Sequence, residues 1–185
     1  MDKIKLELFV GSNFREEEGY QTIGIDIVQP KSKPENCLFF KLNLGFQPLP
    51  NLDSSIDKVN IFDGLEHTAK IVYVQDSEGN IEKLTPFIFL MNEIYRVMKH
   101  DALLTIEVPF GDIAFRRDPT HQTQLGDDWF EYFCKDGTKL YHDQGLINTD
   151  FVLKSNTFRK YLWTDKDIMR TELIARKQIK QKVLI

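Results

Sequence analysis

The stretch "PFIFLMNEIYRVMKHDALLTIEVP", residues 86 to 109, decides the fold class. Its first half is apolar along one broad face of a helix and polar along the other, and Pro86 stands at the first helical position, where proline is favoured. The apolar face comprises Phe87, Leu90, Met91, Ile94, Tyr95, Val97 and Met98. Its second half, residues 102–109, is a continuous apolar run typical of a buried strand. A helix over 86–98 that leads directly into a strand predicts a crossover onto a parallel sheet.

Further strands are predicted on both sides of this stretch. Four short apolar runs precede it, each bounded by turn residues, at 4–10, 22–28, 37–44 and 56–65. Residues 127–133 are expected to begin a helix, and residues 150–163 and 167–178 look like two long strands that pair as a closing hairpin. We therefore expect an α/β fold with a mostly parallel sheet and an antiparallel hairpin at its C-terminal edge.

The length and composition of the chain favour one ordinary globular domain over residues 1–185. The chain has 185 residues, of which 42% are hydrophobic and 28% charged. No apolar segment approaches the length of a membrane span, and no basic start precedes an apolar one, so we expect a cytoplasmic protein with no membrane partner. The two cysteines, Cys37 and Cys134, form neither a disulfide framework nor a metal-ligand spacing, and we expect buried thiols.

Charge is unevenly distributed along the chain. The formal net charge of −4 argues against wholesale coating of nucleic acid, which stays a possible but unfavoured partner. From Lys154 onward, nine basic residues stand against three acidic ones, and residues 177–185 form a basic C-terminal tail. This basic edge either faces a phosphate-bearing substrate or, as we favour, is a solvated strand and tail.

Glycine and polar residues follow the first four predicted strands. In open α/β sheets a ligand binds outside the carboxyl ends of the strands, where these residues meet. Gly11 permits a ligand to approach the backbone, and Asp26 is placed to accept two hydrogen bonds from a ribose diol. The pattern indicates a nucleoside-containing cofactor, with a turn glycine and a solvated aspartate as the alternative.

Several segments together carry a resemblance to a known family. They are "REEEGYQTIGIDI" (15–27), "PLPNLDSSIDKVNIFDGLEH" (48–67), "FLMNEIYRVMKHDALLTIEVP" (89–109) and "DPTH" (118–121). In this combination the chain resembles the class I S-adenosylmethionine-dependent methyltransferases, in particular short bacterial and phage-type members whose first helix is nearly absent. The resemblance covers residues 4 to about 133 and implies a single-domain Rossmann-like methyltransferase sheet.

The resemblance implies a cofactor, S-adenosylmethionine, and a role for each strand-end residue. Gly11, Ser12 and Asn13 would contact its methionine part, Asp26 the ribose, Leu42, Asn43 and Leu44 the adenine, and Asp63, Gly64 and Leu65 the boundary with the substrate. The implied activity is methyl transfer to a small-molecule, glycan or nucleotide-like acceptor. Oxygen is the expected target, because "DGLE" (63–66) replaces the Asn/Asp-Pro-Pro-aromatic segment of amino-group DNA methyltransferases.

The chain departs from the family pattern at three places. Phe9 replaces the first glycine after the first strand, Lys41 stands where an acidic residue normally meets the adenine, with Asn43 beyond it, and "KHDA" (99–102) replaces a Lys-Pro-Gly-Gly turn. The first two keep open a non-catalytic binding or assembly module with a protein partner. A different nucleoside-binding enzyme on the same sheet is a third possibility.

The loop "AFRRDPTHQTQL", residues 114–125, is the predicted acceptor side, within a region of loops and lid spanning 109–150. Asp-Pro favours a turn, so the loop has a defined shape. His121 is a candidate general base with Asp118 orienting its ring, and Arg116 and Arg117 are candidates to hold an anionic group. Alternatively, Asp118 caps the turn and His121 packs on an aromatic ring of Phe115 or Tyr132.

Two further assignments concern histidines and aromatic residues. His67 is a second candidate base, or else a satisfied histidine that fixes the turn after the fourth strand. Tyr132 is a candidate substrate contact in a lid with Phe130, Phe133 and Tyr141, for which the core is the alternative. The sequence spacings of His67, His100, His121 and His142 show no metal-ligand pairing, so no metal is expected.

Overall fold

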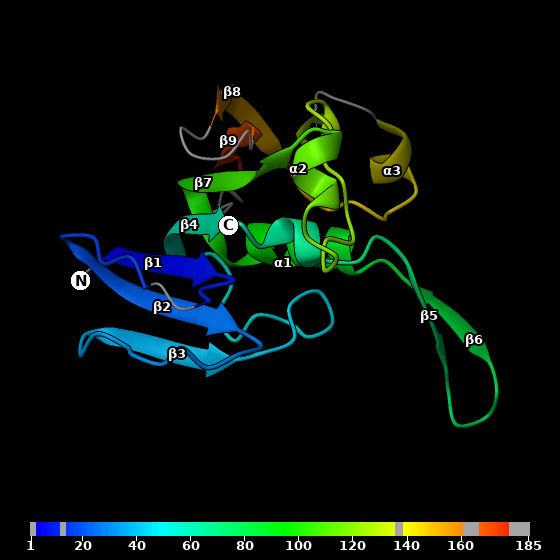
Figure 1. Ribbon diagram of the computed structural model, residues 1–185, viewed down its shortest axis with the longest axis horizontal. Helices are drawn as coiled ribbons and strands as arrows, with labels where there is room; N and C mark the ends of the chain where they lie inside the picture. Colours follow the sequence, from blue (N-terminus) through cyan, green and yellow to red (C-terminus); the bar gives the residue numbers. More distant parts are fainter. Residues whose placement is uncertain (1–2, 12–13, 136–138, 161–166, 178–185) are drawn as a thin grey trace, which may run out of the picture.

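The computed structural model describes residues 3–11, 14–135, 139–160 and 167–177, and seven strands of these residues form one sheet in the order β3-β2-β1-β4-β7-β9-β8 (Figure 1). The strands are β1 (Lys3–Leu8), β2 (Tyr20–Asp26), β3 (Cys37–Lys41), β4 (Ile56–Phe62), β7 (Met98–Phe110), β8 (Phe151–Lys160) and β9 (Asp167–Ala175). Strands β3, β2, β1, β4 and β7 pair in parallel, whereas β9 is antiparallel to both of its neighbours. The predicted fold class is therefore confirmed. The hairpin puts β9 inside the sheet and β8 at its edge.

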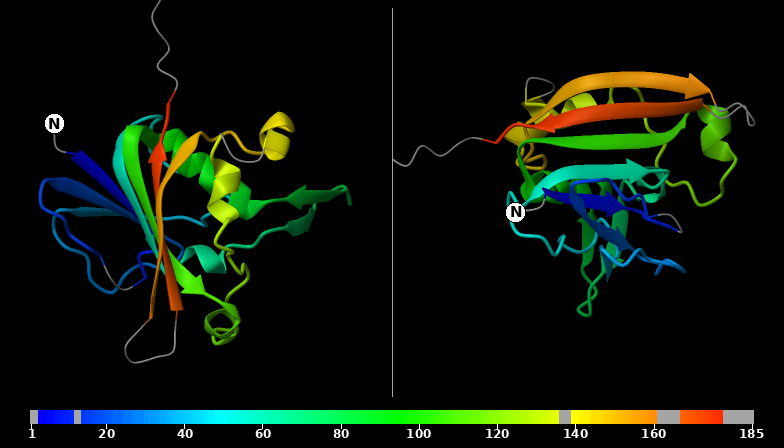
Figure 2. Two further views of the ribbon diagram at one scale, coloured as in Figure 1. Left: turned by 90° about the horizontal axis from the view of Figure 1, so that it is seen from above. Right: turned by 90° about the vertical axis from the view of Figure 1, so that its left-hand side faces the viewer.

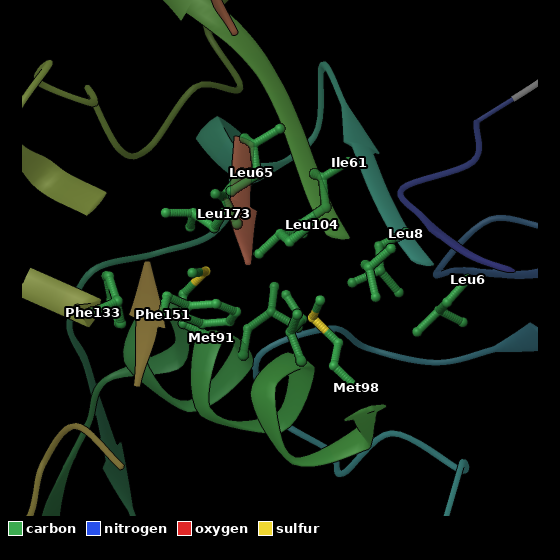
Figure 3. Packing of buried hydrophobic residues seen from close by; sticks show 14 of the residues in the cluster. Leu6, Leu8, Ile61, Leu65, Met91, Met98, Leu104, Phe133, Phe151 and Leu173 are labelled. Carbon is green, nitrogen blue, oxygen red and sulfur yellow. The ribbon is translucent and has the colours of Figure 1, made fainter. Parts of the chain in front are cut away.

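Helix α1 (Pro86–Val97) forms where the amphipathic pattern predicts it, and it is followed at once by β7. Its buried side chains pack on the apolar side chains of the sheet, including Leu8, Ile61 and Leu104 (Figure 3). These residues alternate along their strands, so every second side chain enters one continuous core. This packing fixes the carboxyl ends of β1, β4 and β7 at the same edge of the sheet.

Several short elements were not predicted from the sequence. They are the 3₁₀ turn η1 (Leu65–His67), the hairpin β5 (Val72–Gln75) and β6 (Ile81–Leu84), and helices α2 (Asp112–Arg116) and α3 (Lys139–Asp143). The predicted helix near 127–133 is a 3₁₀ turn, η2 (Trp129–Phe133), and the hairpin β5–β6 projects from the body of the protein (Figure 1). None of the helices described is long and apolar enough to span a membrane. Cys37 and Cys134 are buried free thiols, as expected.

Residues 42–55, which join β3 to β4, are held by α1 although the structure assigns them no helix or strand. The Arg96 guanidinium donates to Glu93 and Asp53 at 2.7 Å each and to the Leu49 and Asn51 carbonyls at 2.9 and 3.0 Å. These carboxylates raise the pKa of Arg96 above its ordinary value, with the Glu93 hydrogen bond the largest cause. Helix α1 thus fixes the connection that ends beside β4.

The helices gather on one side of the sheet (Figure 2). The other side of β1 and β4 carries polar side chains, among them Lys5, Glu7 and Asn60. Lys5 is 1% exposed there, its ammonium lies 3.2 Å from Glu7 and 3.7 Å from Glu17, and it donates to the Arg15 carbonyl. Residues 14–19, which we call the strap, cross this face between β1 and β2 without a helix. The buried lysine therefore ties the strap to the sheet.

Phe14 and Arg15 complete the attachment of the strap. A β-carbon placed on Gly24 would lie 2.5 Å from the Phe14 ring, so the glycine leaves the space that the ring fills. The Arg15 guanidinium lies 3.8 Å from the centre of the Phe62 ring, and its backbone N–H donates to Glu7 at 3.0 Å. The short connection expected after β1 thus covers the sheet with side chains in place of a helix.

We predict that Lys5→Ala lowers the free energy of unfolding by about 3–5 kcal/mol, because it leaves the buried Glu7 carboxylate without its cation. Urea denaturation followed by circular dichroism measures the loss. Lys3→Ala, an exposed position on the same strand, is the matched control and should cost under about 1 kcal/mol. Equal losses in the two variants would contradict the structural role of Lys5.

Candidate functional site

A cavity of about 480 Å³ opens at the carboxyl ends of β1, β2 and β4. It lies there because parallel strands release their loops at the same edge of the sheet. The lining residues come from the ends of β1, β2, β3 and β4, from the loop after α2 and from the base of the β5–β6 hairpin. They are Phe9, Gly11, Asp26, Ile27, Asn43, Leu44, Phe46, Asp63, Gly64, His67, Thr68, Ala69, Val72 and Gln122.

Asp26 is the last residue of β2 and is only 8% exposed. One carboxylate oxygen accepts the Gly11 N–H at 2.7 Å, and the other accepts the Val28 N–H at 3.2 Å. Gly11 has φ of 56°, a left-handed conformation that glycine adopts without strain. The carboxylate is thus fixed at the cavity wall, and its remaining lone pairs are available to a ligand.

Phe9 occupies the position where the family pattern has a glycine, and its φ is 56°. Its N–H donates to the Ile25 carbonyl at 2.9 Å, and its side chain packs on Gly64, where an added β-carbon would lie 2.2 Å from Phe9 Cβ. A second hollow of about 230 Å³, which Arg15 and Asn60 help to line, shares Phe9, Gly11 and Asp63 with the cavity. Phe9 therefore stands at the boundary of the two spaces.

The predicted cofactor residues fall into three groups. Gly11, Asp26, Asn43, Leu44, Asp63 and Gly64 line the cavity. Leu42 and Leu65 do not: Leu65 is fully buried in the core (Figure 3), because it follows β4 on the side facing α1, and Leu42 packs against the same core. Ser12 and Asn13 lie outside the described residues. Ile27 and Phe46 were missed, although Ile27 directly follows the predicted Asp26.

The loop that contains Asp118 and His121 is compact, as the alternative interpretation required. Asp118 accepts hydrogen bonds from the Thr120 hydroxyl at 2.6 Å and the Thr120 N–H at 2.8 Å, and the hydroxyl bond is the main cause of its lowered pKa. The centres of the His121 and Phe115 rings are 5.6 Å apart, and the His121 side chain is 6% exposed. Neither Asp118 nor His121 lines the cavity. Both local contacts of the alternative interpretation are therefore present.

His67 is the predicted catalytic residue that reaches the cavity. The centres of the His67 and His121 rings are 4.9 Å apart, in an edge-to-face arrangement. Nε2 of each histidine is 3.8 Å from Oε1 of Glu66, whose side chain is 2% exposed. Glu66 belongs to the "DGLE" segment (63–66), but the sequence suggested no separate role for it. Its place in the same 3₁₀ turn as His67 was not visible in the sequence, because no helix was predicted there.

Hydrogen bonds join the η1 turn to the distant loop. The Glu66 carbonyl accepts the N–H groups of Gln122 and Thr123 at 2.8 and 2.9 Å. The Thr123 hydroxyl, which is fully buried, donates to the Thr68 carbonyl at 2.5 Å. These bonds hold His67 and His121 side by side although they belong to separate parts of the chain.

The predicted substrate residues do not gather at this cavity. The Arg116 side chain is 79% exposed and lies 3.9 Å from Asp112, and Arg117 is exposed at the end of α2. Tyr132 instead lines a separate, mainly apolar pocket of about 410 Å³ with Trp129 and Tyr141. Phe130 and Phe133 of the predicted lid are buried in the core. Of the residues predicted to contact the acceptor, Tyr132 thus lines the apolar pocket, whereas Arg116 and Arg117 lie on the surface.

Comparison with known proteins identifies the fold. No protein-family model and no curated protein matches the sequence. A solved S-adenosylmethionine-dependent methyltransferase from Methanosarcina mazei matches with a TM-score of 0.62 at 15% identity, over 96% of this chain and 94% of that chain. A structure of the complex between the Haloferax volcanii Trm112 methyltransferase activator and a putative methyltransferase matches with a TM-score of 0.62 at 13% identity, over 95% and 84%.

A third match is an N-methyltransferase from Bradyrhizobium japonicum in complex with S-adenosyl-L-homocysteine. Its TM-score is 0.57 at 9% identity, over 95% of this chain and 79% of that chain. These structural neighbours are class I S-adenosylmethionine-dependent methyltransferases. The likeness confirms the Rossmann-like methyltransferase fold of the present chain.

We predict that Thr123→Val lowers the free energy of unfolding by about 1–3 kcal/mol, because it leaves the buried Thr68 carbonyl without a donor. Amide hydrogen exchange of Gln122 and Thr123 should accelerate, since the contact between the two loops weakens. Thr157→Val, an exposed position on β8, is the control and should change neither quantity. Unchanged exchange at Gln122 in the Thr123 variant would contradict the role of this bond.

Proposed function

We propose that this methyltransferase-fold chain is an S-adenosylmethionine-dependent methyltransferase whose cofactor occupies the cavity at the ends of β1, β2 and β4. The observation that carries the proposal is Asp26, a nearly buried carboxylate at the end of β2, held at the cavity wall by the Gly11 N–H. A carboxylate at this point of an α/β sheet is suited to accept hydrogen bonds from the two hydroxyls of a ribose. The turn-residue alternative leaves unexplained why the carboxylate borders a cavity.

The rest of the cavity suits the nucleoside part of this cofactor. Ile27, Leu44 and Phe46 supply apolar surface for a purine, and the side chain of Asn43 supplies a donor and an acceptor beside them. Lys41 does not line the cavity, so its positive charge does not replace the acidic residue that the family has near the adenine. The volume of about 480 Å³ lies within the usual range of small-molecule sites.

The bound cofactor would supply an activated methyl group on a sulfonium sulfur. The protein's contribution is to hold the acceptor in line with that group, since positioning accounts for much of the acceleration in such a displacement. We assign the acceptor to the β4 side of the cavity, where His67, Thr68 and Gln122 lie. "DGLE" after β4 favours an oxygen acceptor on a small molecule, glycan or nucleotide, with nitrogen, as in the Bradyrhizobium enzyme, the alternative.

One feature favours a second candidate function, a non-catalytic binding or assembly module. Phe9 lies between the cavity and the neighbouring hollow, where the family's glycine leaves room for the methionine part of the cofactor. A cofactor with an amino-acid tail must pass this ring. The two candidate functions therefore differ in whether the intact protein binds the complete cofactor.

We predict that Asp26→Ala weakens binding of S-adenosylhomocysteine by at least about 100-fold, because two hydrogen bonds to a charged group are lost. Isothermal titration calorimetry measures the dissociation constant. Asp127→Ala, an exposed aspartate that does not line the cavity, is the control and should bind like the unaltered protein. Equal affinities of the Asp26 and Asp127 variants would place the cofactor elsewhere.

We predict that Phe9→Gly strengthens binding of S-adenosylmethionine by about 10-fold, equivalent to about 1.4 kcal/mol. Glycine removes the ring that stands between the two spaces and adopts the left-handed backbone without strain. Phe9→Ala separates the two effects, since it opens the space but keeps a β-carbon at φ of 56°. If the folded glycine variant binds no cofactor by calorimetry, the non-catalytic module is the better explanation.

A further inference from the structure

We propose that Glu66, His67 and His121 form a binding site for a divalent transition-metal ion of the zinc class. One ligand atom from each of the three side chains lies within 4.8 Å of the other two. Two imidazole nitrogens and one carboxylate oxygen are a ligand set that catalytic zinc sites use, with a fourth position left for water or substrate. The site goes beyond the proposed methyl transfer and does not depend on it.

The orientation of both imidazole rings fits metal binding. His121 Nδ1 lies 3.0 Å from the Phe115 carbonyl, and because a carbonyl only accepts hydrogen bonds, Nδ1 carries the proton. His67 Nδ1 likewise lies 3.3 Å from the Thr120 carbonyl. A neutral histidine with its proton on Nδ1 has its lone pair on Nε2, and a backbone carbonyl is a common partner of the second nitrogen of a metal-bound histidine.

The hydroxyl of Thr120 supports the same assignment for His67. This hydroxyl lies 3.0 Å from His67 Nδ1 and donates its own proton to Asp118 at 2.6 Å. Its oxygen is therefore an acceptor for the His67 N–H. Both Nε2 atoms then direct lone pairs toward the same region, 3.8 Å from Glu66 Oε1.

The surroundings hold these ligands in place before any ion binds. The side chains of Glu66 and His121 are 2% and 6% exposed, whereas that of His67 is 34% exposed and borders the cavity. The bonds from Gln122 and Thr123 to the Glu66 carbonyl fix the two loops together. The ligand atoms of a tetrahedral zinc site are roughly 3.3 Å apart. Each Nε2 must therefore approach Glu66 Oε1 by about half an ångström, and the two Nε2 atoms, which lie within 4.8 Å of each other, by up to about 1.5 Å.

The chemistry of the ligands narrows the choice of ion. Magnesium and calcium prefer shells made of oxygen, whereas imidazole nitrogen suits zinc, iron, cobalt and nickel. A further carboxylate oxygen, Asp118 Oδ2, lies 3.9 Å from His121 Nε2. A metal here would lower the pKa of a hydroxyl that reached it from the cavity. This consequence for an oxygen acceptor rests on the proposed function, whereas the metal site itself does not.

A proton is the competing occupant of the same space. One imidazole could take a proton on Nε2 and form an ion pair with the Glu66 carboxylate, without any metal. The two occupants differ in stoichiometric metal binding and in its dependence on His67. A binding measurement on the complete chain therefore decides between them.

The test titrates chelator-treated protein with Zn²⁺ and, separately, Co²⁺, without S-adenosylmethionine. We expect one ion per chain by calorimetry, and visible absorption bands from the Co²⁺-loaded protein. His67→Ala should weaken binding by at least about 100-fold and Glu66→Gln by at least about 10-fold. His100→Ala and His142→Ala, which alter the two histidines outside the cluster, should bind as the unaltered protein does. Thermal unfolding of each metal-free variant checks that it is folded.

Several outcomes would overturn the proposal. They are failure of the intact protein to bind either ion, undiminished binding by His67→Ala, or loss of binding in the His100 or His142 variant. Because His67 is partly exposed, its replacement decides the question even if a variant of the buried His121 fails to fold. Asp26→Ala should retain full metal affinity, so that loss of the cofactor site and loss of the metal site are separate results.

Discussion

The packing of helix α1 on β1, β4 and β7 is the constraint on which the rest of the structure depends. It buries alternate residues of each strand and so fixes the register in which Leu8, Ile61 and Ile106 lie side by side. Parallel register brings the loops after these strands to one edge of the sheet. The cavity, the η1 turn and the loop that carries His121 all lie at or beside that edge, because the core permits no other alignment.

Side-chain contacts hold two of the connections between the first four strands against the sheet and against α1. Lys5 and Arg15 hold the strap across the polar face, and Arg96 holds the connection after β3 against α1. A buried cation with several acceptors is sensitive to loss of any one partner, since the charge then stays desolvated. The first connection begins at the cavity beside Gly11, and the second begins there with Asn43, Leu44 and Phe46, so the same few ionic contacts support the walls of the cavity.

Periodicity predicted the sheet and α1 because their apolar residues repeat with the period of the element that buries them. It missed the β5–β6 hairpin, where Tyr73 and Ile81 are exposed and no face is buried. At the site, Asp26 could be predicted since it ends a strand, whereas the meeting of His67 with His121 could not. Spacing rules detect ligands on one helix, and these two residues meet only through loops that the parallel sheet brings together. The sequence likewise does not say which edge of the core an aromatic ring joins, and Tyr132 lines a separate pocket with Trp129 and Tyr141.

Two residues at this edge of the sheet hold a left-handed backbone conformation that favours glycine. Phe9 and Asp63, both lining the cavity, have φ of 56° and 49°, conformations that cost non-glycine residues of order 1 kcal/mol each. The strain is sustained by the bonds of Phe9 to Ile25 and of Asp63 to Glu107, both in the sheet. Ser54 and Asp101, near the amino ends of β4 and β7, have φ of 52° and 61°, so the conformation also occurs away from the cavity. At the cavity this conformation places Phe9 and Asp63 beside Asp26, at the same edge of the sheet at which Glu66, His67 and His121 converge.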